Sequence, residues 1–183
     1  MTFRQILLAT VLIFGGIATF ANAQSTIAVG PQSLMGVAIG TEAESAVAAL
    51  TAKLGAGDDS GWVDGCEFNG VKERYISWGG LSASFEETSE LGNVFINWSY
   101  GIDHETGGSI PGGPTVDQIM LPRGIKMGSK FSNASNAFGV DPMVDDVFGI
   151  GIFSGQYFEM MSADDDLNGP VAQVAVPHFS YCE

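Results

Sequence analysis

A short internal repeat is the feature that most constrains the fold of this chain. Residues 36–41 and residues 124–129 share the pattern Gly-aliphatic-x-[Ile/Met]-Gly-[Thr/Ser] and lie 88 residues apart. A repeated segment at this distance predicts two copies of one supersecondary unit. Coincidence is the alternative, because the matched residue types are common in a chain with 25 glycines.

Each copy of the repeat is predicted to introduce a helix. Thr41 is expected to cap the first helix while Glu44 reaches back in a capping-box arrangement, and Gly55 suits a left-handed stop. Apolar residues at helical spacing then form one buried face, which consists of Ala43, Ala46, Val47, Leu50 and Leu54.

The second predicted helix has the same design and is one turn shorter. Ser129 is expected to cap it, and Gly139 is expected to stop it. Its apolar stripe consists of Phe131, Ala134 and Phe138.

A meander of short strands is predicted after each helix. Two-residue turns at 69–70 and 79–80 supply the positive φ angles of tight hairpins, and the first turn places Glu67 opposite Lys72. The side chains expected to share one face of the fourth strand are Val94, Ile96 and Trp98. The predicted strands are residues 62–68, 71–78, 81–86, 94–99, 116–121, 148–153, 156–161 and 171–176.

These elements predict an α+β fold of two tandem units, each a helix followed by an antiparallel β-meander. Residues 24–100 form the first unit, residues 101–115 form a linker rich in Gly and Pro, and residues 116–183 form the second unit. A lone helix on a small sheet buries little surface, so we expect the two sheets to join in one layer with the helices packed on one face.

The first 23 residues have the pattern of a signal peptide. Arg4 supplies the positive start, residues 6–20 are apolar, and residues 21–23 form a small-x-small cleavage site. A single-span anchor is the alternative, although the apolar run is shorter than the ~20 residues that a bilayer requires. The sequence therefore predicts a secreted or periplasmic protein that begins at Gln24 and keeps no membrane anchor after cleavage.

The chain is strongly acidic, with 21 Asp and Glu against 7 Lys and Arg and a formal charge of -14. Nucleic-acid affinity depends on basic side chains that displace counterions from phosphate, so this charge excludes a nucleic-acid partner. A surface of one sign keeps a protein soluble and can steer a basic partner toward it.

The two cysteines, Cys66 and Cys182, would follow the chain into a compartment where disulfides persist. One pairing is possible, and it would tie the C-terminal end to the first unit. Two separate thiols are the alternative.

The order of these features resembles that of exported bacterial tandem helix-plus-sheet proteins, distantly similar to the β-lactamase-inhibitor-like and SmpA/OmlA-like families. A glycine-led helix start at 36–41, a cysteine and a meander are followed by a second such unit that ends at Cys182. The assembly lipoproteins carry a lipidated cysteine that this chain lacks. The inhibitor proteins place a disulfide inside each unit, whereas Cys66 and Cys182 belong to different units. The resemblance implies a non-enzymatic protein that presents a surface to another exported protein.

One acidic turn is a candidate metal site. Asp164, Asp166 and Asn168 alternate ahead of Gly169, as in the first half of a calcium loop, but Ala175 stands where the bidentate Glu is expected. A solvated hairpin turn explains the same residues. Calcium is the one cofactor that the sequence suggests.

The sequence favours binding over catalysis. It contains no nucleophile elbow, phosphate loop or dinucleotide fingerprint. Protein binding or envelope assembly is the first predicted function, and calcium or small-ligand binding at residues 164–168 is the alternative. The aromatic side chains that could anchor a partner are Trp62, Trp78, Trp98, Tyr75, Tyr100 and Tyr157. For each of them, packing beneath the helices is the alternative role.

Overall fold

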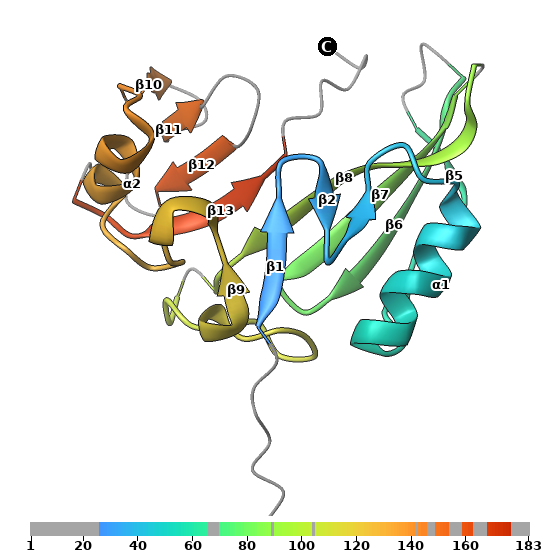
Figure 1. Ribbon diagram of the computed structural model, residues 1–183, viewed down its shortest axis with the longest axis horizontal. Coiled ribbons are helices and arrows are strands. Elements are labelled where there is room, and N and C mark those ends of the chain that lie inside the picture. The colour runs from blue at the N-terminus through green and yellow to red at the C-terminus, as the bar shows by residue number, and fades with distance from the viewer. Residues whose placement is uncertain are drawn as a thin grey trace, which may run out of the picture.

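The computed structural model describes residues 26–65, 70–88, 90–103, 105–141, 143–145, 149–153, 159–162 and 168–176. These residues form an α+β fold of two α-helices and two β-sheets (Figure 1). The predicted signal peptide, both cysteines, one aromatic anchor and part of the acidic turn lie outside the described residues. They are residues 1–23, Cys66, Cys182, Tyr157, Asp164 and Asp166.

The larger sheet joins strands from both halves of the chain in one layer. In spatial order its strands are β10 (Met143–Asp145), β11 (Gly149–Phe153), β12 (Glu159–Ser162), β13 (Val171–Ala175), β8 (Gly92–Gly101), β7 (Leu81–Thr88), β6 (Lys72–Trp78) and β4 (Asp58–Asp59), and β5 (Val63–Asp64) also pairs with β6. All of these pairs are antiparallel. The halves meet where Val174 of β13 lies opposite Tyr100 of β8.

A second sheet of four short strands lies between the helices in Figure 1. Its order is β3 (Val37–Ala38), β2 (Ser33–Leu34), β1 (Ile27–Gly30) and β9 (Ile119–Met120), with β1 and β9 parallel. Two 3-10 helices, η1 (Val116–Gln118) and η2 (Pro122–Gly124), flank β9. The prediction of one strand over residues 116–121 is therefore wrong, because strands of two residues carry no alternation that a sequence pattern can detect.

The buried residues of α1 (Ala43–Leu54) are among those that helical spacing predicts: Ala43, Ala46 and Leu50. The cap is Glu42, whose carboxylate accepts from the backbone N–H groups of Glu44 and Ser45 at 3.1 and 2.8 Å. The predicted capping box of Thr41 and Glu44 is wrong, because the Thr41 backbone is hydrogen-bonded to the larger sheet. Gly55 ends the helix as predicted, but with φ 83° and ψ -175° it does not adopt the predicted left-handed conformation.

α2 (Phe131–Phe138) is the shorter helix, with 8 residues against the 12 of α1. Its buried residues are Phe131 and Ala134, and Phe138 packs partly buried against the core. Gly139 ends the helix in the left-handed conformation, as predicted. The predicted cap is wrong, because Lys130 occupies the cap position and the Ser129 hydroxyl accepts from the Lys126 N–H at 3.3 Å instead.

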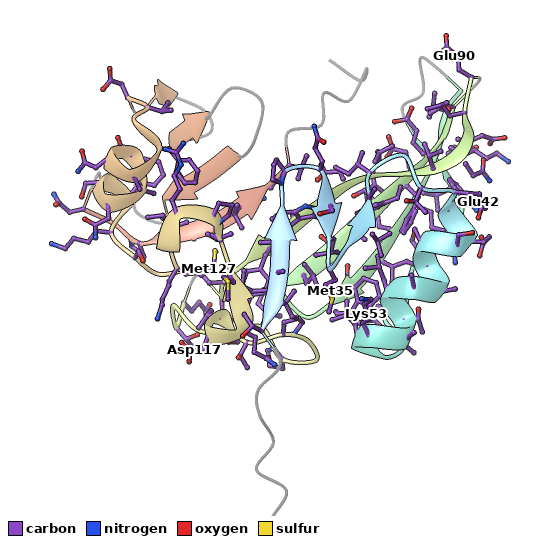
Figure 2. The ribbon with its side chains drawn as sticks, in the orientation of Figure 1. Met35, Glu42, Lys53, Glu90, Asp117 and Met127 are labelled. Atoms are coloured by element: carbon purple, nitrogen blue, oxygen red, sulfur yellow. The ribbon has the colours of Figure 1, made fainter. Side chains whose placement is uncertain are left out.

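The segments that lead into the two helices adopt the same conformation. Met35 and Arg123 have φ angles of 52° and 60°, and each is followed by a glycine with positive φ. Each residue also contacts the C-terminal part of its own helix. Lys53 Nζ donates to the Met35 carbonyl at 3.1 Å (Figure 2), and Arg123 Nη1 donates to the Ala137 carbonyl at 2.6 Å.

Both lead-in segments are also hydrogen-bonded to the larger sheet in the same way. Phe95 exchanges two backbone hydrogen bonds with residues 40–41, at 2.7 and 2.8 Å. Val171 exchanges two with residues 128–129, at 2.9 and 2.8 Å. Each helix therefore starts from a strand-like segment that the sheet already holds.

The hairpins around β6 agree with the sequence prediction at one turn and differ at the other. β6 and β7 pair directly across the predicted turn at residues 79–80. On the other side, Asp64 rather than Glu67 lies opposite Lys72, so this part of the prediction is wrong. The connection is longer than the two residues 69–70 because β5 ends at Asp64 and β6 begins at Lys72.

A bulge between β7 and β8 overturns the prediction for β8. The register shifts at Ile96, beside the point where Phe85 lies opposite Phe95. An extra residue in one strand reverses the alternation beyond it. Val94 and Trp98 therefore point to opposite faces, and Phe95 shares the face of Trp98.

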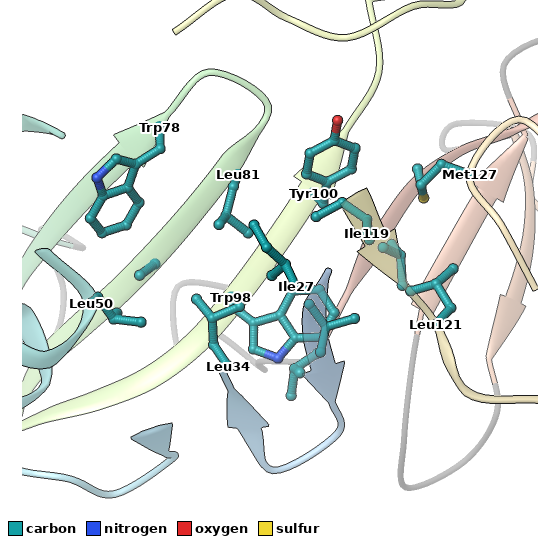
Figure 3. Close-up of a cluster of buried hydrophobic side chains, with 14 of the residues drawn as sticks. Ile27, Leu34, Leu50, Trp78, Leu81, Trp98, Tyr100, Ile119, Leu121 and Met127 are labelled. Carbon is teal, nitrogen blue, oxygen red and sulfur yellow. The ribbon is translucent and has the colours of Figure 1, made fainter. Parts of the chain in front are cut away.

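Trp78 and Trp98 lie on one face of the larger sheet, which we call the inner face. Their indole Nε1 atoms donate to the carbonyls of Gly55 and Gly30, both at 2.9 Å. Gly55 follows α1 and Gly30 ends β1, so α1 and the four-stranded sheet cover this face together. Figure 3 shows both indoles with Leu50 of α1 in the buried cluster.

The predicted linker at residues 101–115 starts at Gly101, the last residue of β8, and its described remainder is a loop that contacts the sheet. A Cβ atom on Gly113 would lie 1.8 Å from the Trp78 carbonyl oxygen, so only glycine fits this approach. The Tyr100 hydroxyl donates to the Pro114 carbonyl at 3.0 Å. The loop therefore closes one end of the inner core.

Candidate functional site

Three of the six predicted aromatic anchors belong to the core. Trp78, Trp98 and Tyr100 have exposed fractions of 2, 0 and 0%, and each donates its polar hydrogen to a backbone carbonyl. The structure corrects the partner-binding prediction for these three residues. The strand register turns them toward the inner face, where no partner can reach them.

Tyr75 is the predicted anchor that stays at the surface. It is 42% exposed, while its neighbour Ile76 is 2% exposed. Because side chains alternate along a strand, Tyr75 points away from the inner face. Trp62 packs partly buried against the core, and Tyr157 lies outside the described residues.

The side of β6, β7 and β8 opposite the core is called the outer face. By strand register its side chains include Glu73, Tyr75, Ser77, Ser82, Ser84, Glu86, Val94, Asn97 and Ser99. The hydroxyls of Ser82 and Ser99 lie 2.9 Å apart in a hydrogen bond. Asn97 Oδ1 is buried and accepts no hydrogen bond from any described group. The outer face therefore consists mainly of polar side chains, with the buried Val94 opposite Glu86 as an apolar member.

Two carboxylates and one aromatic ring gather at one end of the outer face. Glu73 lies directly opposite Glu86, and the Tyr75 hydroxyl donates to the Glu73 carboxylate. Val63, opposite Glu73 on β5, is 42% exposed. We call Val63, Glu73, Tyr75 and Glu86 the Tyr75 cluster.

The electrostatics of this cluster are negative. Partial burial, then the hydrogen bond to Glu73 and the charges of Glu73 and Glu86, raise the pKa of Tyr75 to about 12. The phenol therefore stays protonated at neutral pH and keeps donating to Glu73.

The basic side chains of β6 are directed to the other side of the sheet. Arg74 forms ion pairs with Asp59 at 2.5 Å and Glu44 at 2.6 Å. The hydrogen bond from Arg74 holds the pKa of Asp59 below its usual range. Lys72 lies two residues before Arg74 on β6, so its side chain is on the same side of the sheet as that of Arg74. Lys72 lies opposite Asp64 on β5. The positive charges of β6 are therefore not used on the outer face.

The predicted calcium turn is represented by one described residue, the exposed Asn168. Asp164 and Asp166 lie outside the described residues. Within the ranges that the structure describes, no three His, Cys, Asp or Glu side chains come together as metal ligands.

A comparison of the chain with protein-family models, characterised proteins and solved structures finds no significant match. Neither α-helix in the described part of the chain has the length and apolar character needed to cross a bilayer.

The turn at residues 79–80 could have predicted the Tyr75 cluster from the sequence. A two-residue turn there fixes Glu73 opposite Glu86 and Tyr75 opposite Ser84, which is the observed register. Sequence reasoning that groups acids along the chain, such as residues 86–87, misses this pair because it forms across strands.

Proposed function

We propose that this protein is an exported, non-enzymatic module that binds another exported protein through the outer face. The observation that supports the proposal is the exposed ring of Tyr75 beside two carboxylates. Tyrosine is enriched among the residues that dominate binding energy, because it offers a large rigid surface with a polar tip. Small hydroxyl side chains around the ring leave room for a partner to approach.

Site-specific photocrosslinking in the native host tests this function. p-Benzoylphenylalanine replaces Tyr75 in one variant and Met120 in a matched control, since Met120 is 55% exposed in the four-stranded sheet. We expect one discrete protein adduct from position 75 and none from position 120. Equal adducts from both positions, or no adduct from position 75, would contradict the proposal.

We also propose that the chain consists of two tandem units with both helices on one face of the sheet. The cap residues Glu42 and Lys130 support this, with φ and ψ of -52° and 135° against -55° and 134°. An experimental structure tests it, because residues 131–176 should superpose on the corresponding helix and strands of residues 43–101. Helices on opposite faces would contradict the plan.

Export is the remaining part of the proposal, and it rests on the charge, apolar run and cleavage pattern of residues 1–23. The intact mass of the protein from the exported fraction should correspond to a chain that begins at Gln24. An uncleaved chain retained with the membrane would support the anchor alternative instead.

A further inference from the structure

One buried valine lies on the outer face, apart from the core. Val94 is 5% exposed, but it is not part of the contiguous core cluster that contains the other buried apolar residues of the described chain. The residues directly opposite it are Glu86 on β7 and Glu42 ahead of α1. An apolar side chain is removed from water by apolar neighbours. The burial of Val94 therefore indicates that an apolar segment covers this part of the outer face.

The end of β13 directs the chain to this place. The Val176 N–H donates to the Trp98 carbonyl at 3.0 Å, beside β8. Further along the same edge of β8, Phe95 exchanges two backbone hydrogen bonds with residues 40–41, so this edge is occupied. Pro177 also has no backbone N–H with which to extend the pairing. The chain therefore has to leave the plane of the larger sheet after Val176.

The two sides of the sheet differ in the space that they offer at this point. On the inner side the four-stranded sheet covers Trp98, whose indole Nε1 donates to the Gly30 carbonyl at 2.9 Å. On the outer side Tyr75 is 42% exposed, which marks a surface that the folded chain leaves open. The outer side is therefore the open path for the residues that follow Val176.

The segment that follows Val176 has apolar side chains at the required spacing. Residues 177–183 include Phe179 and Tyr181, which share one side of an extended segment because they are two residues apart. Four residues along β8 and one strand spacing place Val94 roughly 14 Å from Val176. About 10 Å of extended chain leads to residue 179 and about 17 Å to residue 181, so Val94 falls between the two aromatic positions.

We propose that residues 177–183 dock on the outer face of β8 and that Phe179 and Tyr181 cover Val94. The segment then borders the surface around Tyr75 without covering it, because Tyr75 lies two strands away on β6. This inference goes beyond the proposed function, since it concerns a contact within the chain itself.

Nuclear Overhauser spectroscopy of the full mature chain, with the valine methyl groups labelled, tests the contact. We expect cross peaks from the Val94 methyl groups to the ring protons of Phe179, of Tyr181 or of both. Val29 is the internal control, because it is as deeply buried at 7% exposed but belongs to the core cluster. Its methyl groups should show no cross peak to either ring.

A double variant tests whether these rings shield Val94 from water. In Phe179→Ser with Tyr181→Ser, a water-soluble gadolinium chelate should relax the Val94 methyl protons about fivefold faster than in the unchanged chain, because their apolar cover is gone. The Val29 methyl protons should relax as before. Tyr75→Ser is the matched control variant, since it removes an aromatic side chain from the same face and should leave the relaxation of Val94 unchanged.

Three results would overturn the inference: no cross peak from Val94 to either ring, unchanged relaxation of Val94 in the double variant, or an equal increase in Tyr75→Ser. The cross peaks are measured on the unchanged chain, so they decide the contact even where the double variant does not fold. Cross peaks without a protein adduct at position 75 would reject the proposed function and leave the docked segment standing. An adduct without cross peaks would do the reverse.

Discussion

The two faces of β6, β7 and β8 use the same residue types in opposite ways. On the inner face, Trp78 and Trp98 are buried and their indole N–H groups donate to backbone carbonyls. On the outer face, Tyr75 is 42% exposed and its hydroxyl donates to a carboxylate. An aromatic residue in this sheet is therefore assigned to core or surface by its register, and composition alone does not distinguish the two.

The two sides of the sheet also differ in how their charged side chains are paired. The inner side neutralises its acids, since Arg74 pairs with both Asp59 and Glu44. The outer side places Glu73 opposite Glu86. The two sides of the sheet therefore differ: the inner side holds its arginine in ion pairs, and the outer side places two carboxylates beside an exposed aromatic ring.

The largest expected effect comes from truncating one aromatic residue on each face. Trp98→Ala should lower the free energy of unfolding by about 3–5 kcal/mol, because it opens a cavity in the core. Tyr75→Ala should lower it by about 0.5 kcal/mol, as expected of a surface position. Urea unfolding measures both, and equal losses would remove the distinction between the faces.

The glycine that closes the inner core should give the next effect. Gly113→Ala places a Cβ atom 1.8 Å from the Trp78 carbonyl oxygen, so the loop has to move away. We expect a loss of about 1–3 kcal/mol in urea unfolding. Gly108→Ala is the matched control, because its Cβ atom would meet only the Thr106 hydroxyl, at 3.3 Å. An equally large loss of stability in this control would show that the contact at Gly113 does not specifically hold the loop.

The Arg74 ion pair should give a smaller effect that depends on pH. The pKa of Asp59 is lowered in the folded protein, so its contribution is present above the ordinary value of 3.8 and is lost as pH falls below it. Asp59→Asn should therefore cost about 1 kcal/mol at pH 7, reduced by solvent screening at a partly exposed pair, and almost nothing near pH 2.

Urea unfolding of the Asp59→Asn variant at both pH values checks this dependence. Asp117→Asn is the control and should show no such change between the two conditions. A constant cost at both pH values would mean that the ion pair does not stabilise the fold.

The smallest expected effect concerns the phenol of Tyr75. Because its pKa is raised to about 12, its contribution to stability is present below the ordinary value of 10.0 and is lost as pH rises between the two. Absorbance at alkaline pH, taken as the difference between the protein and Tyr75→Phe, should give a midpoint near 12. Glu73→Gln should lower this midpoint. An unchanged midpoint would show that the Glu73 carboxylate does not affect the Tyr75 phenol.

Sequence patterns predicted the features of this fold that depend on local chemistry. The apolar faces of both helices and their glycine stops follow from spacing, and the turn at residues 79–80 fixes the register of β6 and β7. The helix caps were displaced by one residue because sheet pairing extends to Thr41 and Ser129. That pairing comes from distant strands, which no local pattern contains.

The candidate site was only partly accessible to the same reasoning. Tyr75 could be named as an aromatic anchor, and the pairing of Glu73 with Glu86 follows from the turn. The bulge at Ile96 could not be anticipated, because it depends on how β7 and β8 pair along their whole length. The bulge also exchanges the faces on which Val94 and Phe95 lie. Simple alternation therefore gave the wrong face for Val94 in β8, the longest described strand of this sheet.

Amide chemical-shift mapping of the full mature chain, titrated with the protein that the position-75 adduct identifies, tests the central claim most directly. If the partner binds over Tyr75, the largest shifts should fall on residues 73–75 and 84–86, with α1 unaffected. The largest shifts on residues 43–54, or small shifts spread over all acidic segments, would contradict binding at the outer face.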